Sequence, residues 1–314
     1  MPTFKVKLSS NSKSHIALLA AGLIFGANYW IAKGLMPLWF TPSQILFLRV
    51  GAATGLFWII GLLYPKDKIA KKELLRIAIC SLLGVVINQF MFFEGLRLSH
   101  PVEASILHTT SPIFVMIFAA SLIGESITWQ KLSGILLGTI GALTIVIKAN
   151  GVSFSSDTFR GNLFILANII SYSLYIVLVK PVMMKHNPIV VIKWTFLFGF
   201  LFCAPFTLSS VTEIQWNLLP GHIWLSILYV IIGSTFLAYL LTIFALKYLS
   251  AMVVGFYIYL QPLLAATVGL IFYAERPTLL KGFAACLIFV GVYLVNRSSN
   301  DVNKGVGKVP EANP

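Results

Sequence analysis

Polar and ionisable side chains lie inside long apolar runs of this chain, at spacings that place several of them on shared helix faces. Tyr29 and Lys33 are four residues apart on one run. Asn168, Tyr172 and Tyr175 stand at positions i, i+4 and i+7 of another. Such groups need a partner or a wet cavity, because leaving them alone in hydrocarbon is costly. Their chemistry is that of binding: hydroxyls, amides and an ammonium group can line a pocket for a ligand with polar and apolar parts.

Several ionisable residues in these runs admit two interpretations each. Lys33 either reaches a cavity or extends to the nearby membrane interface. Lys180, near the inner end of its own apolar run, has the same two interpretations. Glu94 is either a gate or proton site, or the ion-pair partner of Lys33 or Arg49. His108 is either a proton carrier or a structural histidine with satisfied hydrogen bonds.

Pro112 and Pro262 lie inside two apolar runs, where a proline frees a backbone carbonyl and bends the helix towards a cavity. We expect the polar residues near these bends and on the shared faces to bind substrate. The candidate substrate-binding residues are Asn28, Tyr29, Lys33, Asn88, Glu94, His108, Tyr172, Tyr175, Tyr239, Tyr257 and Gln261.

The apolar runs themselves predict an all-α integral membrane protein. Of the 314 residues, 58% are apolar and 11% charged, with a mean hydropathy of +0.89. Each run approaches the roughly 20 residues that cross a bilayer as a helix, and none has the alternation of a membrane barrel. We expect ten transmembrane helices, over residues 16–36, 44–64, 75–97, 103–123, 131–148, 160–181, 190–210, 222–246, 251–273 and 279–296.

The charges predict the orientation of these helices. Most of the 23 Lys and Arg residues fall in segments that share one side of the membrane when the N-terminus is inside. Both the segment 1–15 and a disordered tail, 297–314, are therefore expected in the cytoplasm. This bias also accounts for the net charge of +13 without nucleic-acid binding. The three cysteines show no metal-binding spacing, so we expect no metal and no cofactor.

The two halves of the chain resemble each other at a constant offset of 150 residues. Pro112 aligns with Pro262, and Glu125 with Glu275. Segments 16–148 and 160–296 then hold five helices each, and an odd number makes the second unit inverted relative to the first. Inverted repeats recur in secondary transporters. The two glutamates are expected to have a structural role near the N-termini of the helices that follow them, and Thr128 and Thr278 are the candidate caps of those helices.

The sequence resembles the EamA-type family of the drug/metabolite transporter superfamily. The resemblance rests on three segments and covers about residues 16–296: Phe25 to Lys33, Gly95 to Thr128 with Pro112, and Ala245 to Thr278 with Pro262. It implies a ten-helix exporter of metabolites or amino acids, with a central cavity lined mainly by helices 1, 3, 4, 6, 8 and 9.

We therefore expect a secondary transporter that exports a small metabolite, amino acid or drug-like solute by alternating access. The alternatives are an integral-membrane enzyme acting on lipids, or a channel or sensor. No Walker A sequence is present, so ATP does not drive it directly. We expect a monomer or weak homodimer in a bacterial inner membrane, with the lipid bilayer and a small-molecule substrate as partners. Coupling to protons or another ion is also expected.

Overall fold

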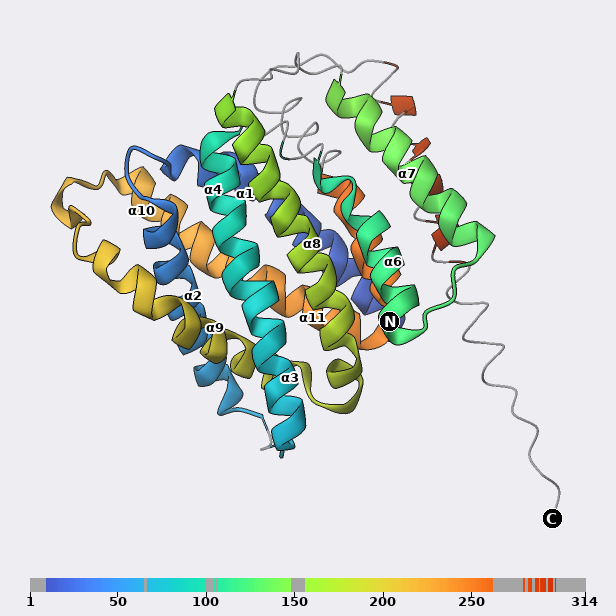
Figure 1. Ribbon diagram of the computed structural model, residues 1–314, viewed down its shortest axis with the longest axis horizontal. Helices are drawn as coiled ribbons and strands as arrows, with labels where there is room; N and C mark the ends of the chain where they lie inside the picture. The colour runs from blue at the N-terminus through green and yellow to red at the C-terminus, as the bar shows by residue number, and fades with distance from the viewer. Residues whose placement is uncertain are drawn as a thin grey trace, which may run out of the picture.

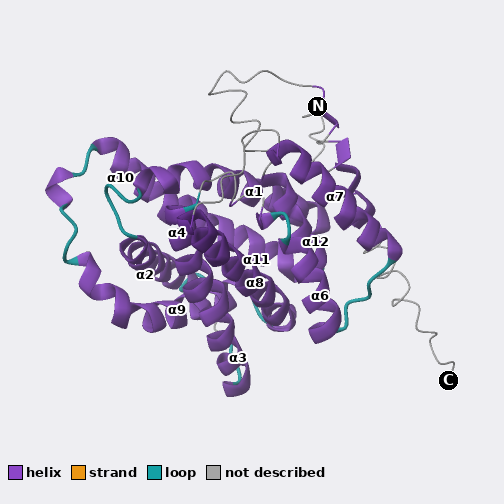
Figure 2. Ribbon diagram, turned by 45° about the horizontal axis from the view of Figure 1, so that its top comes forward, coloured by secondary structure: helices purple, strands orange, loops and turns teal. Residues whose placement is uncertain are grey.

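The structure is a computed structural model that describes residues 10–64, 67–99, 104, 107–147 and 156–261, with single residues and short helical runs between 279 and 297. Within these residues every regular element is a helix, as expected, and the helices lie side by side (Figures 1 and 2). Pro262, Glu275 and Thr278 lie outside the described residues, as does the expected tail from residue 298 onward.

Six of the described helices are long and apolar enough to cross a membrane. They are α1 (Ser10–Leu35), α2 (Pro42–Gly61), Lys71–Leu98, Phe159–Lys185 of α8 (Ser156–Lys185), α9 (Pro188–Val211) and Gly221–Tyr248. Three more are α6 (Ser111–Ile123), α7 (Trp129–Ile147) and the short α12 (Ala251–Phe256), which continues as a 3-10 turn, η4 (Tyr257–Tyr259).

Two of these spans contain a π-helical segment near the middle. Lys71–Leu98 consists of α3 (Lys71–Ser81), the π-helical η1 (Leu82–Ile87) and α4 (Asn88–Leu98). Gly221–Tyr248 repeats this order as α10 (Gly221–Leu228), η3 (Tyr229–Leu237) and α11 (Ala238–Tyr248). Because a π turn breaks the regular i to i−4 ladder, it leaves backbone carbonyls that side chains can reach.

The predicted bend at Pro112 is a full interruption of the helix. Residues 104, 107 and 108 are helical, but a turn at Thr109–Thr110 separates them from α6, whose first turn contains Pro112. The expected single helix over 103–123 is therefore wrong. The reason is that Pro112 has no N–H with which to continue the ladder.

Glu125 also differs from its expected role. It was expected to support the helix that follows it, but its Oε1 accepts the backbone N–H of Ala251 at 2.9 Å, at the start of α12. Thr128, the candidate cap, accepts the N–H of Lys131 at the start of α7, at 3.3 Å. The carboxylate thus supports a helix N-terminus in the other half of the chain.

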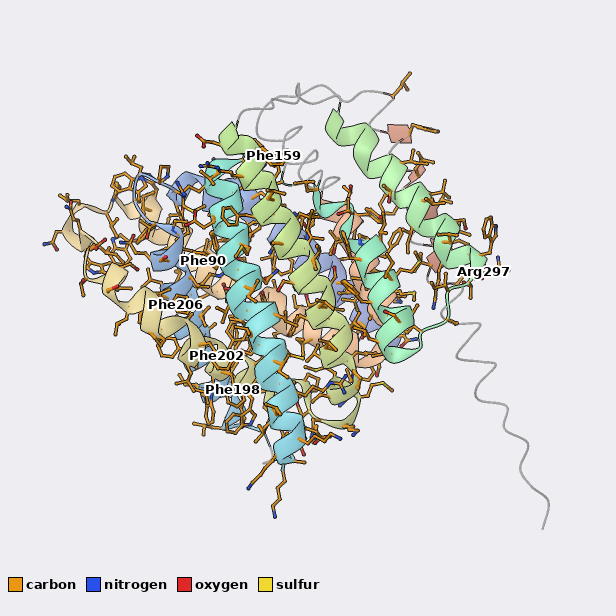
Figure 3. The ribbon with its side chains drawn as sticks, in the orientation of Figure 1. Phe90, Phe159, Phe198, Phe202, Phe206 and Arg297 are labelled. Carbon is orange, nitrogen blue, oxygen red and sulfur yellow. The ribbon has the colours of Figure 1, made fainter. Side chains whose placement is uncertain are left out.

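The outer face of the bundle is apolar. Along α9, Phe198, Phe202 and Phe206 follow one outward face (Figure 3), and Phe206 is 56% exposed. Polar side chains lie inside instead: Ser81 donates to the carbonyl of Thr195 at 2.6 Å, and both residues are fully buried. An apolar exterior around a polar interior is the arrangement expected of a protein surrounded by lipid.

Corresponding helices of the two halves pack in corresponding ways. Helix α4 of the first half packs along α8 of the second, and correspondingly α11 of the second half packs along α1 of the first. Likewise η1 packs on α9 as η3 packs on α2, while α2 and α9 pack on each other. Helices far apart in the sequence therefore form the centre of the bundle.

Close helix contacts depend on small residues. A Cβ on Gly84, in η1, would lie 2.3 Å from the ring of Tyr175 of α8. Gly95 and Gly161 approach each other in the same way, each meeting backbone of the other helix within 3.0 Å. These glycines let α8 pack directly against the π segment and α4.

A charged cluster links the loops between α2 and α3 and between α8 and α9. His186 contacts Asp67 through Nδ1 at 3.0 Å and Glu73 through Nε2 at 2.9 Å, and Lys185 contacts Glu73 at 3.2 Å. Burial alone would lower the pKa of His186, but its bonds to the two carboxylates raise it above 6.5. Burial acts to raise the pKa of Asp67, but hydrogen bonds from His186 and Asn187, with nearby Lys247, lower it below 3.8.

The first prediction concerns the contact between Gly84 and Tyr175. Gly84→Ala should lower the free energy of unfolding by about 1–3 kcal/mol, because the added methyl group overpacks a buried contact. Gly55→Ala, where nothing lies within 4 Å, should cost nothing. Thermal unfolding in detergent measures both. Equal stability of the two variants would show that α8 does not pack on η1 in this way.

The second prediction concerns the pH dependence of the loop cluster. A histidine whose pKa is raised stabilises the fold below its unfolded pKa, and this contribution is lost as the pH rises through the folded pKa. Asp67 works oppositely, losing its contribution as the pH falls below 3.8. The cluster should therefore be most stabilising between pH 3.8 and 6.5.

The melting temperatures of the wild type and His186→Gln should differ more at about pH 6 than at about pH 8, by a few degrees. A constant difference at both pH values would contradict an ionised cluster.

Candidate functional site

A cavity of about 100 Å³ lies at the centre of the bundle, between the two halves. Its wall comes from α1, α2, α4, α6, α8, α11, α12 and η4. His108, which precedes α6, and Gln261, which follows η4, also belong to it. The polar residues of the wall are Asn28, Tyr29, Arg49, Asn88, Gln89, His108, Ser111, Asn168, Tyr172, Tyr239, Thr242, Tyr257 and Gln261.

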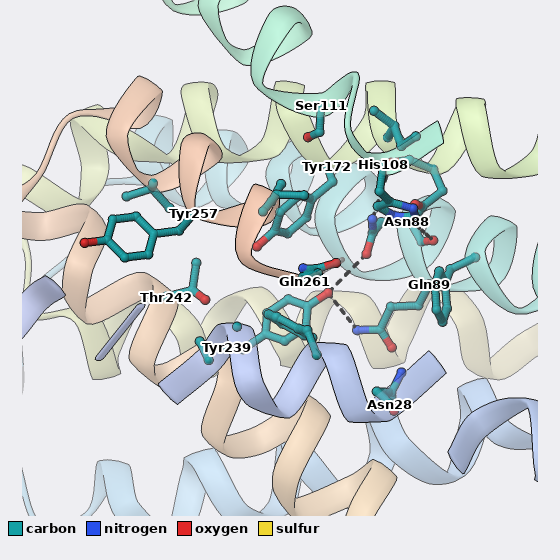
Figure 4. Close-up of a pocket in the computed structure, with 18 of the residues that line it drawn as sticks. Asn28, Asn88, Gln89, His108, Ser111, Tyr172, Tyr239, Thr242, Tyr257 and Gln261 are labelled. Carbon is teal, nitrogen blue, oxygen red and sulfur yellow. Dashed lines mark hydrogen bonds between the residues drawn. The ribbon is translucent and has the colours of Figure 1, made fainter. Parts of the chain in front are cut away.

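Tyr239 is the centre of a hydrogen-bond network on this wall. Its hydroxyl lies 2.9 Å from the carbonyl oxygen of Gly84 and 3.1 Å from Asn88 Oδ1, and it accepts from Gln89 Nε2 at 3.2 Å. Figure 4 shows the two amides directed at this hydroxyl. Asn168 Nδ2 donates to the carbonyl of Asn88 at 2.7 Å. Because Gly84 belongs to η1, the π segment positions α11 against α4.

Arg49 of α2 is anchored on the second π segment. Its Nε donates to Thr235 Oγ1 at 2.7 Å, and this hydroxyl donates to the carbonyl of Val230 in η3 at 2.6 Å. The guanidinium carbon lies 4.9 Å from the ring centre of Phe93. A cation that is 4% exposed is thereby held at the cavity wall.

An aromatic group forms another part of the wall. The ring of Tyr29 makes edge contacts with Phe92 at 5.5 Å and His108 at 5.7 Å between ring centres. The Tyr29 hydroxyl donates to Gln261 Oε1 at 3.2 Å. His108 Nδ1 donates to the carbonyl of Ala104 at 2.9 Å, so Nε2 of the neutral ring is an acceptor. These rings offer an apolar surface beside the amide network.

Among the described residues, three amide oxygens of the wall have no hydrogen-bond partner. They are Asn28 Oδ1, Gln89 Oε1 and Asn168 Oδ1, and each of these residues is less than 5% exposed. Buried oxygens of this kind are costly unless something else binds them. The oxygens themselves are buried, so each can accept a hydrogen bond from a bound molecule once its side chain turns toward the cavity.

The structure brings eight of the eleven candidate residues to this cavity: Asn28, Tyr29, Asn88, His108, Tyr172, Tyr239, Tyr257 and Gln261. Their role in binding stays a prediction. The Tyr257 hydroxyl turns away from the other polar groups (Figure 4), and it hydrogen-bonds His15 Nδ1 at 2.7 Å. Tyr257 can therefore contact a ligand through its ring and not through its hydroxyl.

The other three candidates lie elsewhere. Tyr175 is fully buried against Gly84, because it lies about 60° around α8 from Tyr172, its neighbour three residues earlier. Glu94 pairs with Arg97 on its own helix at 2.8 Å rather than with Lys33 or Arg49.

Lys33 caps a helix end. Its Nζ donates to the carbonyls of Leu96, Arg97 and Ser99 at 2.7, 3.2 and 3.0 Å, at the C-terminus of α4. Lys180 does the same for α11, donating to the carbonyls of Leu246 and Leu249. Both lysines therefore satisfy orphan carbonyls instead of extending to the interface.

Arg49 and Gln89 are missing from the candidates predicted from the sequence, although both line the cavity. An arginine within an apolar run is itself the signal that could have identified it. Gln89 neighbours Asn88, and both side chains reach the Tyr239 hydroxyl although consecutive residues diverge by 100° on a helix.

The site has the chemistry of binding. Within the part of the chain that the structure describes, no cluster of His, Cys, Asp or Glu could hold a metal ion. The described part of the cavity wall contains amides, hydroxyls, rings and one permanent cation, and no carboxylate is among these described residues. Such a wall can hold and orient a small amphipathic molecule.

Known proteins share this architecture. The EamA-like transporter family matches residues 12–147 and again residues 159–297. An uncharacterized transporter of Archaeoglobus fulgidus is 28% identical over 90% of this chain and 97% of its own. A probable terminal-alkyne amino-acid exporter of Streptantibioticus cattleyicolor is 23% identical over 72% of this chain and 74% of its own. One crystal structure has a TM-score of 0.72 with 19% identity, over 92% of this chain and 99% of the other.

The third prediction separates helix capping by Lys33 from binding. Lys33→Met should lower the free energy of unfolding by about 2 kcal/mol, because three carbonyls lose a charged donor. It should leave the relative affinities for different ligands unchanged. Lys13→Met, at a lysine for which the described residues show no polar partner, is the matched control. A Lys33→Met protein of unchanged stability but altered ligand preference would contradict the capping role.

Proposed function

The chain belongs to the EamA-like transporter family, and on this basis we propose that it is a secondary transporter that exports a small metabolite, amino acid or drug-like solute. The observation that carries the proposal is the central cavity, which polar and apolar side chains line together within a bundle whose outer face is apolar. A lipid-facing bundle has no need of open hydrogen-bond acceptors at its centre unless a polar molecule enters there. Export is supported by the name of the Streptantibioticus cattleyicolor relative.

We further propose that the complete fold has ten transmembrane helices with both termini in the cytoplasm. Segments 16–148 and 160–296 are the two inverted five-helix units of this arrangement. The two successive family matches support it, as do the corresponding packing of α4 on α8 and α11 on α1 and the π segments η1 and η3. Two similar units of opposite orientation have two nearly equivalent states, one open to each side of the membrane.

The transport cycle follows from this arrangement. The solute binds in the cavity, one unit rocks against the other, and the cavity opens to the far side. Coupling to a proton or another ion drives net export, and the acceptor Nε2 of His108 is the candidate proton carrier in the cavity. We place the protein in a bacterial inner membrane as a monomer or weak homodimer.

The fourth prediction tests transport through the cavity. Purified protein in liposomes should exchange radiolabelled solutes from a panel of amino acids and aromatic metabolites, with saturable kinetics and faster net flux under a pH gradient. Gln89→Leu should reduce the flux about tenfold, since a lost hydrogen bond of about 1.4 kcal/mol corresponds to that factor.

Gln130→Leu is the matched control, because Gln130 is exposed on α7 away from the cavity. Equal flux in both variants would place the pathway elsewhere. Discrete single-channel currents in planar bilayers would favour a channel over a carrier.

A further inference from the structure

Arg49 is a buried cation without a counter-ion in the described structure. It is 4% exposed and lines the cavity, and its only hydrogen bond is from Nε to Thr235. The two Nη groups thus have no acceptor among the described residues. The contact with the ring of Phe93 offsets part of the cost of burying the charge, but it does not neutralise the charge.

The described carboxylates are engaged or distant. Glu94 pairs with Arg97, Glu125 bonds the N–H of Ala251, and Asp67 and Glu73 belong to the loop cluster. The described residues that line the cavity include no Asp or Glu. A buried cation with no anion beside it favours a ligand that supplies the missing charge.

The acceptors on the same wall are also open. Among the described residues, no group donates to Asn28 Oδ1, Gln89 Oε1 or Asn168 Oδ1, so a ligand with N–H or O–H groups can satisfy them when these side chains turn toward the cavity. Tyr29 and Phe92 provide an apolar surface next to them. The cavity is therefore complementary to a small molecule that combines an anionic group, adjacent hydrogen-bond donors and an apolar part.

We propose that Arg49 binds the carboxylate of the transported molecule, while the open amide oxygens bind its amino or hydroxyl group. The ligand is then a small α-amino or α-hydroxy carboxylic acid. A planar guanidinium forms two parallel bonds with a carboxylate, and one cation balances one carboxylate. This inference rests on the proposed function, since it names the class of solute carried.

Binding and transport are measured separately to test it. Thermal stabilisation of the purified protein reports binding of three series, each built on one side chain: the amino acid, its hydroxy acid, its primary amide and the amine without the carboxylate. Flux of the same labelled compounds in liposomes reports transport. The expected result is stabilisation by the amino acid and hydroxy acid of at least one series, with weak or no stabilisation by the amide and the amine.

Arg49→Gln should weaken binding of the acids at least tenfold and leave the weak binding of the amides unchanged. Arg49→Lys keeps the charge without the planar fork and should fall between wild type and Arg49→Gln. Arg97→Gln is the matched control on the protein surface and should behave as wild type. A purely structural role for Arg49 would instead weaken acids and amides equally.

Each other outcome overturns the proposal. These outcomes are no binding of any acid in the panel, amines or amides bound as tightly as acids, or equal effects of Arg49→Gln and Arg97→Gln. Acid binding that depends on Arg49 without any flux would leave this inference standing and contradict transport instead. The two failures are therefore distinguishable.

Discussion

Hydrogen bonding within a bundle surrounded by lipid is the constraint on which the rest of this structure depends. No water reaches the outer face to bind a free N–H or C=O group, so each polar group needs a partner inside. Lys33 satisfies the last carbonyls of α4, and Lys180 satisfies those of α11. Side chains likewise occupy carbonyls in both π segments, those of Gly84 and Val230. Among the described residues, Asn28, Gln89 and Asn168 keep amide oxygens without a partner, and all three line the central cavity beside the unpaired charge of Arg49.

The two π segments connect the fold to the site. Each interrupts a membrane-spanning helix near its middle and offers carbonyls that a regular α-helix would use itself. Tyr239 is oriented by η1 and Arg49 by η3, so each π segment positions a cavity residue that comes from a different helix. A movement of one half against the other would therefore reorganise both sides of the cavity together.

The sequence predicted the six long apolar helices and eight polar residues of the cavity wall, because apolar length and helical spacing are local properties. It could not predict which way a helix face turns relative to its neighbours. Tyr172 and Tyr175 are close in sequence, yet only Tyr172 reaches the cavity, since Gly84 leaves room for the Tyr175 ring behind the wall. Glu94 and Arg49 are predicted as partners by their depth in the membrane, but Glu94 pairs with Arg97 on its own helix and Arg49 lines the cavity. The spacing of apolar residues in the sequence does not indicate the two π segments.

Water access to the cavity from each side of the membrane tests the central claim most directly. Ser111 lines the cavity, whereas Ser81 is fully buried against the carbonyl of Thr195. In protein whose three native cysteines are replaced by alanine, Ser111→Cys should react with a charged thiol reagent added on either side, and Ser81→Cys with neither. Reaction of Ser111→Cys from neither side, or from one side only under every condition, would contradict an alternately accessible central site.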